Sequence, residues 1–185
     1  MVHRKARRAA PPLNESTLRE LALAYVGRFA TTRTKLRVYL ARKIRERGWG
    51  GAGEPGLEAL ADAFAAQGYV DDAGFALAKA QALAARGYGK RRLIERLRGA
   101  GVQEDDSVAA REHSDSEAVE AALRFAERRR IGPFALAPAD TKAREKALAA
   151  LVRAGHSFAL ARAIAALPPG ATIDRDELAA LSGDG

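Results

Sequence analysis

The side chains that most often perform catalysis or bind metals are few in this chain and lie far apart. The three histidines are His3, His113 and His156, and none has a second histidine at the spacing of a metal site. We interpret each as a solvated or turn residue. The chain has no cysteine, which excludes disulfides, thiolate metal ligands and cysteine nucleophiles.

One dipeptide, Gly89-Lys90, resembles the end of a phosphate-binding loop. Ala84 stands where that loop needs its first glycine, and Arg91 stands where a hydroxyl should reach Mg²⁺. The sequence therefore excludes this class of nucleotide-binding site.

Two acidic pairs, Asp71-Asp72 and Asp105-Asp106, have the residue types that bind metal ions. Both stand just before or early in predicted helices, where a carboxylate caps the helix and complements its dipole. The sequence also contains no Ser-His-Asp set and no G-x-S-x-G motif. We therefore predict that the chain is not an enzyme and takes no metal or cofactor.

The composition favours helices and an anionic partner. Of the 185 residues, 48% are apolar and 43 are alanine, the best helix former, whereas aromatic residues make up only 6%. The net charge is +8, and 24 of the 31 basic residues are arginine, whose charge does not titrate. No stretch reaches 18 apolar residues, and the basic N-terminus lacks an apolar signal segment. We predict no membrane span and a cytoplasmic location.

Apolar residues at helical spacing, interrupted by glycine and proline, predict an all-α fold. Thr17 and Glu20 predict a capping box at the start of the first helix, and Phe75 is predicted to be a core residue. One turn is expected around residues 177–181. The predicted helices span about residues 17–29, 34–47, 56–67, 72–86, 90–98, 103–112, 116–130, 140–154 and 157–167.

The helices repeat with a period near 53 residues. In each repeat an apolar pair four residues apart faces the core, and a glycine then ends the helix in the left-handed conformation. These residues are Leu40, Ile44 and Gly48, then Leu93, Leu97 and Gly101, then Ala147, Leu151 and Gly155. The alternative is a chance similarity among helices rich in alanine, leucine and glycine.

A three-helix unit of this size barely closes its own core, so neighbouring units should share apolar faces. We therefore predict three tandem three-helix repeats stacked in an elongated, curved row. The predicted parts are a disordered basic arm at residues 1–13, repeats at 14–69, 70–112 and 113–167, and an acidic C-terminal tail at 168–185.

Positive charge is concentrated in three segments, residues 28–49, 86–98 and 124–130. In the first two, arginines and lysines lie on the second helix of a predicted repeat, away from its buried leucines. Stacked repeats would align them in a basic stripe suited to phosphates or an acidic protein surface. The alternative is an ordinary solvated helix face. The predicted contact residues are Arg37, Arg42, Lys43, Arg45, Lys90, Arg91, Arg92 and Arg96.

Four motifs in this order resemble the RecX family. The run Gly68–Ala76, GYVDDAGFA, is similar to that family's G-Y-[LIV]-[ND]-D-x-x-[FY]-A signature. Arg33-Thr34 followed by Leu40–Lys43 resembles its R-[ST]…EL…KL helix. Gly87–Leu93 and Leu97–Val102 resemble its G-x-G-x-x-[RK]-[IL] and L-x-x-x-G-[IV] segments. The resemblance covers about residues 16–167.

The resemblance implies a cytoplasmic regulatory protein of tandem three-helix repeats that binds the RecA recombinase, free or as its filament on single-stranded DNA. Such proteins usually inhibit the recombinase ATPase and strand exchange, and so act in DNA repair, homologous recombination and the SOS response. We expect a monomer with weak DNA binding. Two other readings stay open, namely a helical protein that binds nucleic-acid phosphates directly and a generic helical-repeat scaffold.

Overall fold

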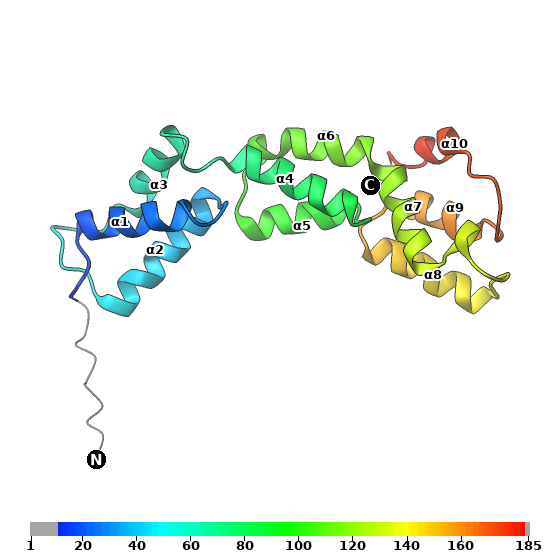
Figure 1. Cartoon of the computed structure of the whole chain (residues 1–185), viewed down its shortest axis with the longest axis horizontal. Helices are drawn as coiled ribbons and strands as arrows, with labels where there is room; N and C mark the ends of the chain where they lie inside the picture. Colours follow the sequence, from blue (N-terminus) through cyan, green and yellow to red (C-terminus); the bar gives the residue numbers. More distant parts are fainter. Residues whose placement is uncertain (1–10, 184–185) are drawn as a thin grey trace, which may run out of the picture. The chain divides into compact units, whose positions relative to one another are not determined.

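The computed structural model describes residues 11–183, and every regular element among them is helical (Figure 1). The predicted all-α fold is confirmed. The helices are α1 (Glu15–Val26), α2 (Arg33–Arg47), α3 (Leu57–Ala66), α4 (Asp72–Ala85), α5 (Lys90–Ala100), α6 (Val108–Ser116), α7 (Ala118–Arg129), α8 (Thr141–Arg153), α9 (Phe158–Ala166) and α10 (Arg175–Ala180). Two 3₁₀ turns are η1 (Asp105–Ser107) and η2 (Gly132–Phe134).

The chain divides into two compact units after Asp72. In the first unit, α1, α2 and α3 enclose one hydrophobic core, in which Leu13, Leu36, Leu40 and Phe64 are almost completely buried. The leucines of α2 lie four residues apart, one turn after another on the buried face, as the sequence spacing predicts.

Asp72, the first residue of α4, is buried and binds the start of α2. Its Oδ1 accepts a hydrogen bond from the backbone N–H of Arg33 at 2.9 Å, and its Oδ2 pairs with Arg33 Nε at 3.3 Å. The first N–H groups of a helix have no partner within it, so this carboxylate satisfies one of them. The sequence predicts that Asp71 or Asp72 caps a helix. The structure shows that Asp72 caps α2, at Arg33, which lies 39 residues earlier in the chain.

The second unit contains two hydrophobic cores. The smaller core lies among α4, α5 and α6, and its buried side chains are Ala76, Ala80, Leu83, Leu93, Leu97 and Ala110. The larger core involves α7, α8, α9 and α10, and its buried side chains include Phe125, Leu151, Leu160, Ile164 and Leu178. Leu178 lies in α10, so the segment predicted to be an acidic tail contributes to this core.

The helix-ending glycines all have a positive φ. Gly101 has the predicted left-handed helical conformation, whereas the ψ of 164° at Gly48 lies outside it. Gly48, Gly101 and Gly155 have φ angles of 84°, 69° and 99°, a region that side chains with a Cβ rarely adopt. The following N–H then turns back to the helix, as Val102 N donates to Leu97 O at 3.1 Å and His156 N to Leu151 O at 3.3 Å. The matched helix ends of the second and third predicted repeats therefore close in the same way.

The two cores of the second unit meet through close backbone contacts. Gly89 N donates to Ala154 O at 3.0 Å, and Arg91 N donates to Gly155 O at 3.2 Å. A Cβ placed on Gly89 would collide with the Gly155 carbonyl, and one on Gly87 would lie 2.8 Å from Phe125 N. The start of α5 thus packs directly on the end of α8, and glycine is required for that approach.

His156 lies in this junction and is only 2% exposed. Its Nε2–H donates to the Gly87 carbonyl at 3.1 Å, and its ring packs against Phe125 with centroids 6.0 Å apart. Burial lowers the pKa of His156 to about 4, against the smaller opposing effect of the Gly87 carbonyl. The prediction of a solvated or turn histidine is therefore wrong, because its partner comes from a distant part of the chain.

Two local predictions differ from the structure, one at the start of α1 and one in α4. The N-cap of α1 is Asn14, which forms a capping box with Thr17, whereas the sequence suggested Thr17 with Glu20. Phe75 is half-buried and lies outside the core, because Ala76 and Ala80 form the inner face of α4.

The predicted basic arm extends to residue 13, but Leu13 is fully buried. Its N–H donates to Gly48 O at 2.9 Å, and its carbonyl accepts from Gly50 N at 2.8 Å. Residues 1–10 of that arm lie outside the described residues. The predicted boundary at 112/113 falls inside α6, which continues to Ser116.

Candidate partner-binding surface

Four of the predicted contact residues lie on α2. Arg37 pairs with Glu58 of α3, and Lys43 and Arg42 pair with Glu46 at 2.7 and 3.7 Å. Glu46 is one turn further along the same helix, a spacing that the sequence itself reveals. The hydrogen bond from Lys43, followed by the charges of the nearby cations, lowers the pKa of Glu46.

Arg45 completes the group on α2 and is exposed. Within the described residues it forms no ion pair with a carboxylate. Nearby, Tyr39 stacks on Tyr25 of α1 with ring centroids 4.1 Å apart. The Arg42 and Lys43 cations lie 5.7 and 5.9 Å from the centre of the Tyr39 ring, within the range of a cation–π interaction.

The other four predicted residues lie on α5. Lys90 pairs with Asp115 of α6 at 2.6 Å, and Arg92 pairs with Glu95 at 3.3 Å. Arg91 and Arg96 are exposed, and neither forms an ion pair among residues 11–183. These two arginines are therefore the predicted contact residues of α5 that are available to a partner, and Arg98 on the same helix is also exposed without an ion pair among the described residues.

The backbone beneath Arg91 is held in place. Its N–H donates to Gly155 O at 3.2 Å, while its side chain extends into solvent. On the opposite face of α5, Leu93 and Leu97 are buried. A rigid helix with a fixed N-terminus thus presents the exposed arginines, which lowers the entropy cost of binding through them.

The structure brings the predicted residues together as two groups, one on α2 and one on α5. That these groups form one continuous stripe stays a prediction. Five of the eight residues already have a carboxylate partner, namely Arg37, Arg42, Lys43, Lys90 and Arg92. Sequence reasoning missed Glu58 and Asp115 as partners because both come from other helices.

In the third basic segment, residues 124–130, two arginines bind backbone carbonyls within the second unit. Arg124 Nε donates to Ala84 O at 3.2 Å and its Nη2 pairs with Glu117 at 2.6 Å. Arg128 Nη1 donates to Arg86 O at 2.9 Å. Both arginines therefore satisfy carbonyls at the end of α4 and strengthen the junction within the second unit.

Among residues 11–183, no helix is long and apolar enough to cross a bilayer. In the same range, no three histidine or acidic side chains gather in a way that suits a metal ion.

Comparison with known proteins identifies the family of this chain. No protein-family model matches the chain. The fold resembles the crystal structure of RecX from Lactobacillus salivarius with a TM-score of 0.58 and 15% identity, over 80% of this chain and 92% of that chain. The sequence is 34% identical over 156 residues to the regulatory protein RecX of Myxococcus xanthus (strain DK1622), covering 80% of this chain and 83% of that protein. With this identity over most of both chains, the protein belongs to the RecX family of regulatory proteins.

Proposed function

We propose that this protein regulates the RecA recombinase, free or as its filament on single-stranded DNA, and that it inhibits the ATPase and strand-exchange activities. It would act in the cytoplasm, as a monomer, in DNA repair, homologous recombination and the SOS response. Family membership supports a regulatory role. The four sequence motifs that resemble the family, together with the basic helices, support the choice of partner.

The single observation that carries the contact surface is the pair Arg91 and Arg96. Both are exposed and lack a carboxylate partner among the described residues, and the backbone N–H of Arg91 binds the end of α8. An arginine fork binds a carboxylate or a phosphate with two hydrogen bonds, so this pair suits an acidic protein surface or a nucleic-acid backbone. Arg45 on α2, in the first unit, is likewise exposed and forms no ion pair with a carboxylate among the described residues.

The test is the recombinase ATPase on single-stranded DNA, titrated with this protein. Inhibition at a ratio of far fewer regulator molecules than DNA-binding sites supports the proposal, because a protein that only covers DNA must saturate it. An ATPase rate that stays constant until the DNA is saturated contradicts the proposal.

A second candidate function is direct binding of nucleic-acid phosphates, which the net charge of +8 favours. Its affinity for a single strand would fall with salt, with a log–log slope of about −0.7 per phosphate neutralised. A generic helical scaffold is the third candidate. Pull-down of a partner with and without nuclease distinguishes a scaffold from a nucleic-acid-binding protein. A scaffold retains its protein partner after the DNA is digested.

A further inference from the structure

A cavity of about 380 Å³ lies in the second unit, among the end of α7, η2, α8 and the end of α9. Its walls are mostly apolar, and no aromatic or acidic side chain lines it. The apolar wall residues are Ile131, Ala135, Pro138, Ala139, Ala143, Ala147, Ala150, Ala165, Ala166, Leu167, Pro168 and Pro169. None of the eight contact residues predicted from the sequence lines this cavity.

Four cations line the same cavity, namely Arg129, Arg130, Arg144 and Lys146. All four are exposed, and among the described residues none forms an ion pair with a carboxylate. Five of the eight residues on α2 and α5, by contrast, already have such a pair. The positive charge around this cavity is therefore uncompensated within residues 11–183.

Two of these cations are positioned by the backbone. Arg144 Nε donates to Ala139 O at 3.0 Å, which orients its guanidinium beside the loop before α8. Arg130 ends α7 with φ 55° and ψ 51°, and it is the only residue other than glycine with a positive φ among residues 11–183. At the ends of α2, α5 and α8 glycine has the positive φ. An arginine at this position costs backbone free energy, and it puts a cation on the cavity wall.

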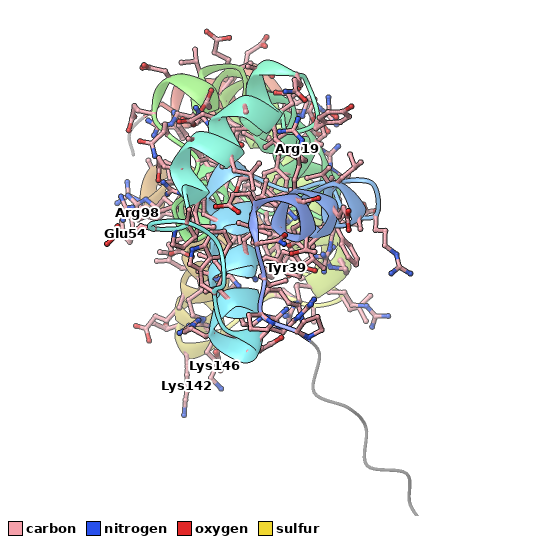
Figure 2. The ribbon with its side chains drawn as sticks, turned by 90° about the vertical axis from the view of Figure 1, so that its left-hand side faces the viewer. Arg19, Tyr39, Glu54, Arg98, Lys142 and Lys146 are labelled. Carbon is pink, nitrogen blue, oxygen red and sulfur yellow. The ribbon has the colours of Figure 1, made fainter. Side chains whose placement is uncertain are left out.

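A backbone hydrogen bond and several prolines hold the cavity walls in place. Gly170 N donates to Pro133 O at 2.9 Å, which ties the segment after α9 to η2. Proline restricts φ at three wall positions, Pro138, Pro168 and Pro169. Lys142, one turn before the wall residue Lys146, is also exposed, and both side chains project away from the ribbon in Figure 2. The two lysines add positive charge near one wall of the cavity and would attract an anion from a distance.

We propose that this cavity is a second binding site, which accepts a short acidic segment of a partner protein with one or two apolar side chains as its anchor. The apolar walls would bury the anchor, and the surrounding cations would bind carboxylates on either side of it. A nucleic-acid base fits less well, because no aromatic side chain is present to stack on it. The volume is near the lower end of the range for ligand pockets, which matches one or two side chains. The inference does not rest on the proposed function.

The test measures binding of a fluorescein-labelled octapeptide, in which a Leu-Phe pair stands between two runs of three Asp or Glu residues. Fluorescence anisotropy with the full-length protein gives Kd. Arg130→Gly removes one cation and places glycine where the backbone favours it, so the variant should fold at least as stably as the parent. Ala143→Phe fills the cavity from an exposed position. Arg153→Gln removes one charge from α8 outside the cavity and is the matched control.

The expected result is that Arg130→Gly and Ala143→Phe each weaken peptide binding by about fivefold or more, while Arg153→Gln changes it by less than about twofold. A peptide with Ser-Gly in place of Leu-Phe should bind weakly. No peptide binding, or binding unaffected by the two cavity variants, overturns the proposal. The proposal is also overturned if the Ser-Gly peptide binds as tightly as the Leu-Phe peptide. A thymidine octanucleotide that binds in the cavity, when the peptide does not, overturns it as well. No recombinase is present, so these outcomes leave the proposed function untouched.

Discussion

The imidazole Nε2 of His156 donates a hydrogen bond of 3.1 Å to the carbonyl of Gly87, which lies 69 residues earlier in the chain. A carbonyl oxygen only accepts, so this bond requires a proton on Nε2. Because burial lowers the pKa of His156 to about 4, the ring is neutral at pH 7 and this is its only proton on nitrogen. Gly87 lies in the turn after α4, which ends at Ala85, so its carbonyl has no partner within a helix. The His156 side chain, beside the α7–α10 core, thus satisfies the turn between α4 and α5.

The first prediction concerns pH. The pKa of His156 is about 4 in the folded protein, below its ordinary value of 6.5. Between these values the unfolded chain binds a proton that the folded protein does not, so stability is complete above pH 6.5 and is lost as the pH falls toward 4. We expect this residue to lower the free energy of unfolding by about 2 kcal/mol between pH 7 and pH 5.

The measurement is urea unfolding at pH 7, 6 and 5 for the parent and for His156→Gln, which retains an N–H donor but cannot titrate. The carboxylates titrate equally in both proteins, so the difference between the two pH profiles isolates the histidine. Parallel profiles would mean that His156 takes up a proton in the folded state.

The second prediction concerns the glycine contact between α5 and α8. Gly89→Ala places a methyl group against the Gly155 carbonyl and should destabilise the protein by about 1–3 kcal/mol. Gly99→Ala is the control in the same helix, because a Cβ there meets nothing within 4 Å. It should stabilise the protein by about 0.5–1 kcal/mol. Thermal unfolding followed by circular dichroism measures both, and equal effects of the two changes would contradict the close approach.

The third prediction concerns Leu13, which precedes α1 and is fully buried in the core of the first unit. Leu13→Ala should lower the free energy of unfolding by about 2–5 kcal/mol, because it leaves a cavity. Leu136→Ala is the matched control, since Leu136 is 82% exposed, and it should have an effect within about 0.5 kcal/mol. If denaturant unfolding finds both variants as stable as the parent, Leu13 is not part of the core.

The fourth prediction concerns regulation. Arg91→Glu with Arg96→Glu should raise the concentration needed for half-inhibition of the recombinase ATPase by about tenfold or more, since the surface charge is reversed. The melting temperature should change by only a few degrees, because both side chains are exposed. Arg153→Glu, on the exposed side of α8, should inhibit as the parent does. If the double variant is folded and inhibits the ATPase as well as the parent does, α5 is not part of the contact surface.

Most helices of this fold could be predicted from the sequence, because their signals are local. The leucine spacing in α2 and the glycines after α2, α5 and α8 lie within a few residues of the structure that they determine. Gly101 and Gly155 have the positive φ that the repeat pattern predicts. Leu13 escaped prediction because its core neighbours come from α1, α2 and α3, and no periodicity precedes it.

The candidate site could be predicted only in part. The pairs of Arg42 and Lys43 with Glu46 follow from helical spacing, whereas the pair of Lys90 with Asp115 depends on how α5 and α6 pack. Sequence alone therefore cannot separate cations that already have partners from those that are available. His156 is a second example. The local sequence suggests a solvated or turn residue, and only the distant contact with Gly87 shows that the side chain is buried.

The approach of α8 to α5 also accounts for the dipeptide Gly89-Lys90. In a nucleotide-binding protein, a glycine at the start of a helix exposes N–H groups that surround a phosphate. Here the N–H groups of Gly89 and Arg91 bind the carbonyl oxygens of Ala154 and Gly155 instead. The electron-rich end of one helix thus occupies the position that a phosphate anion would take, and the dipoles of α8 and α5 run head to tail across two cores.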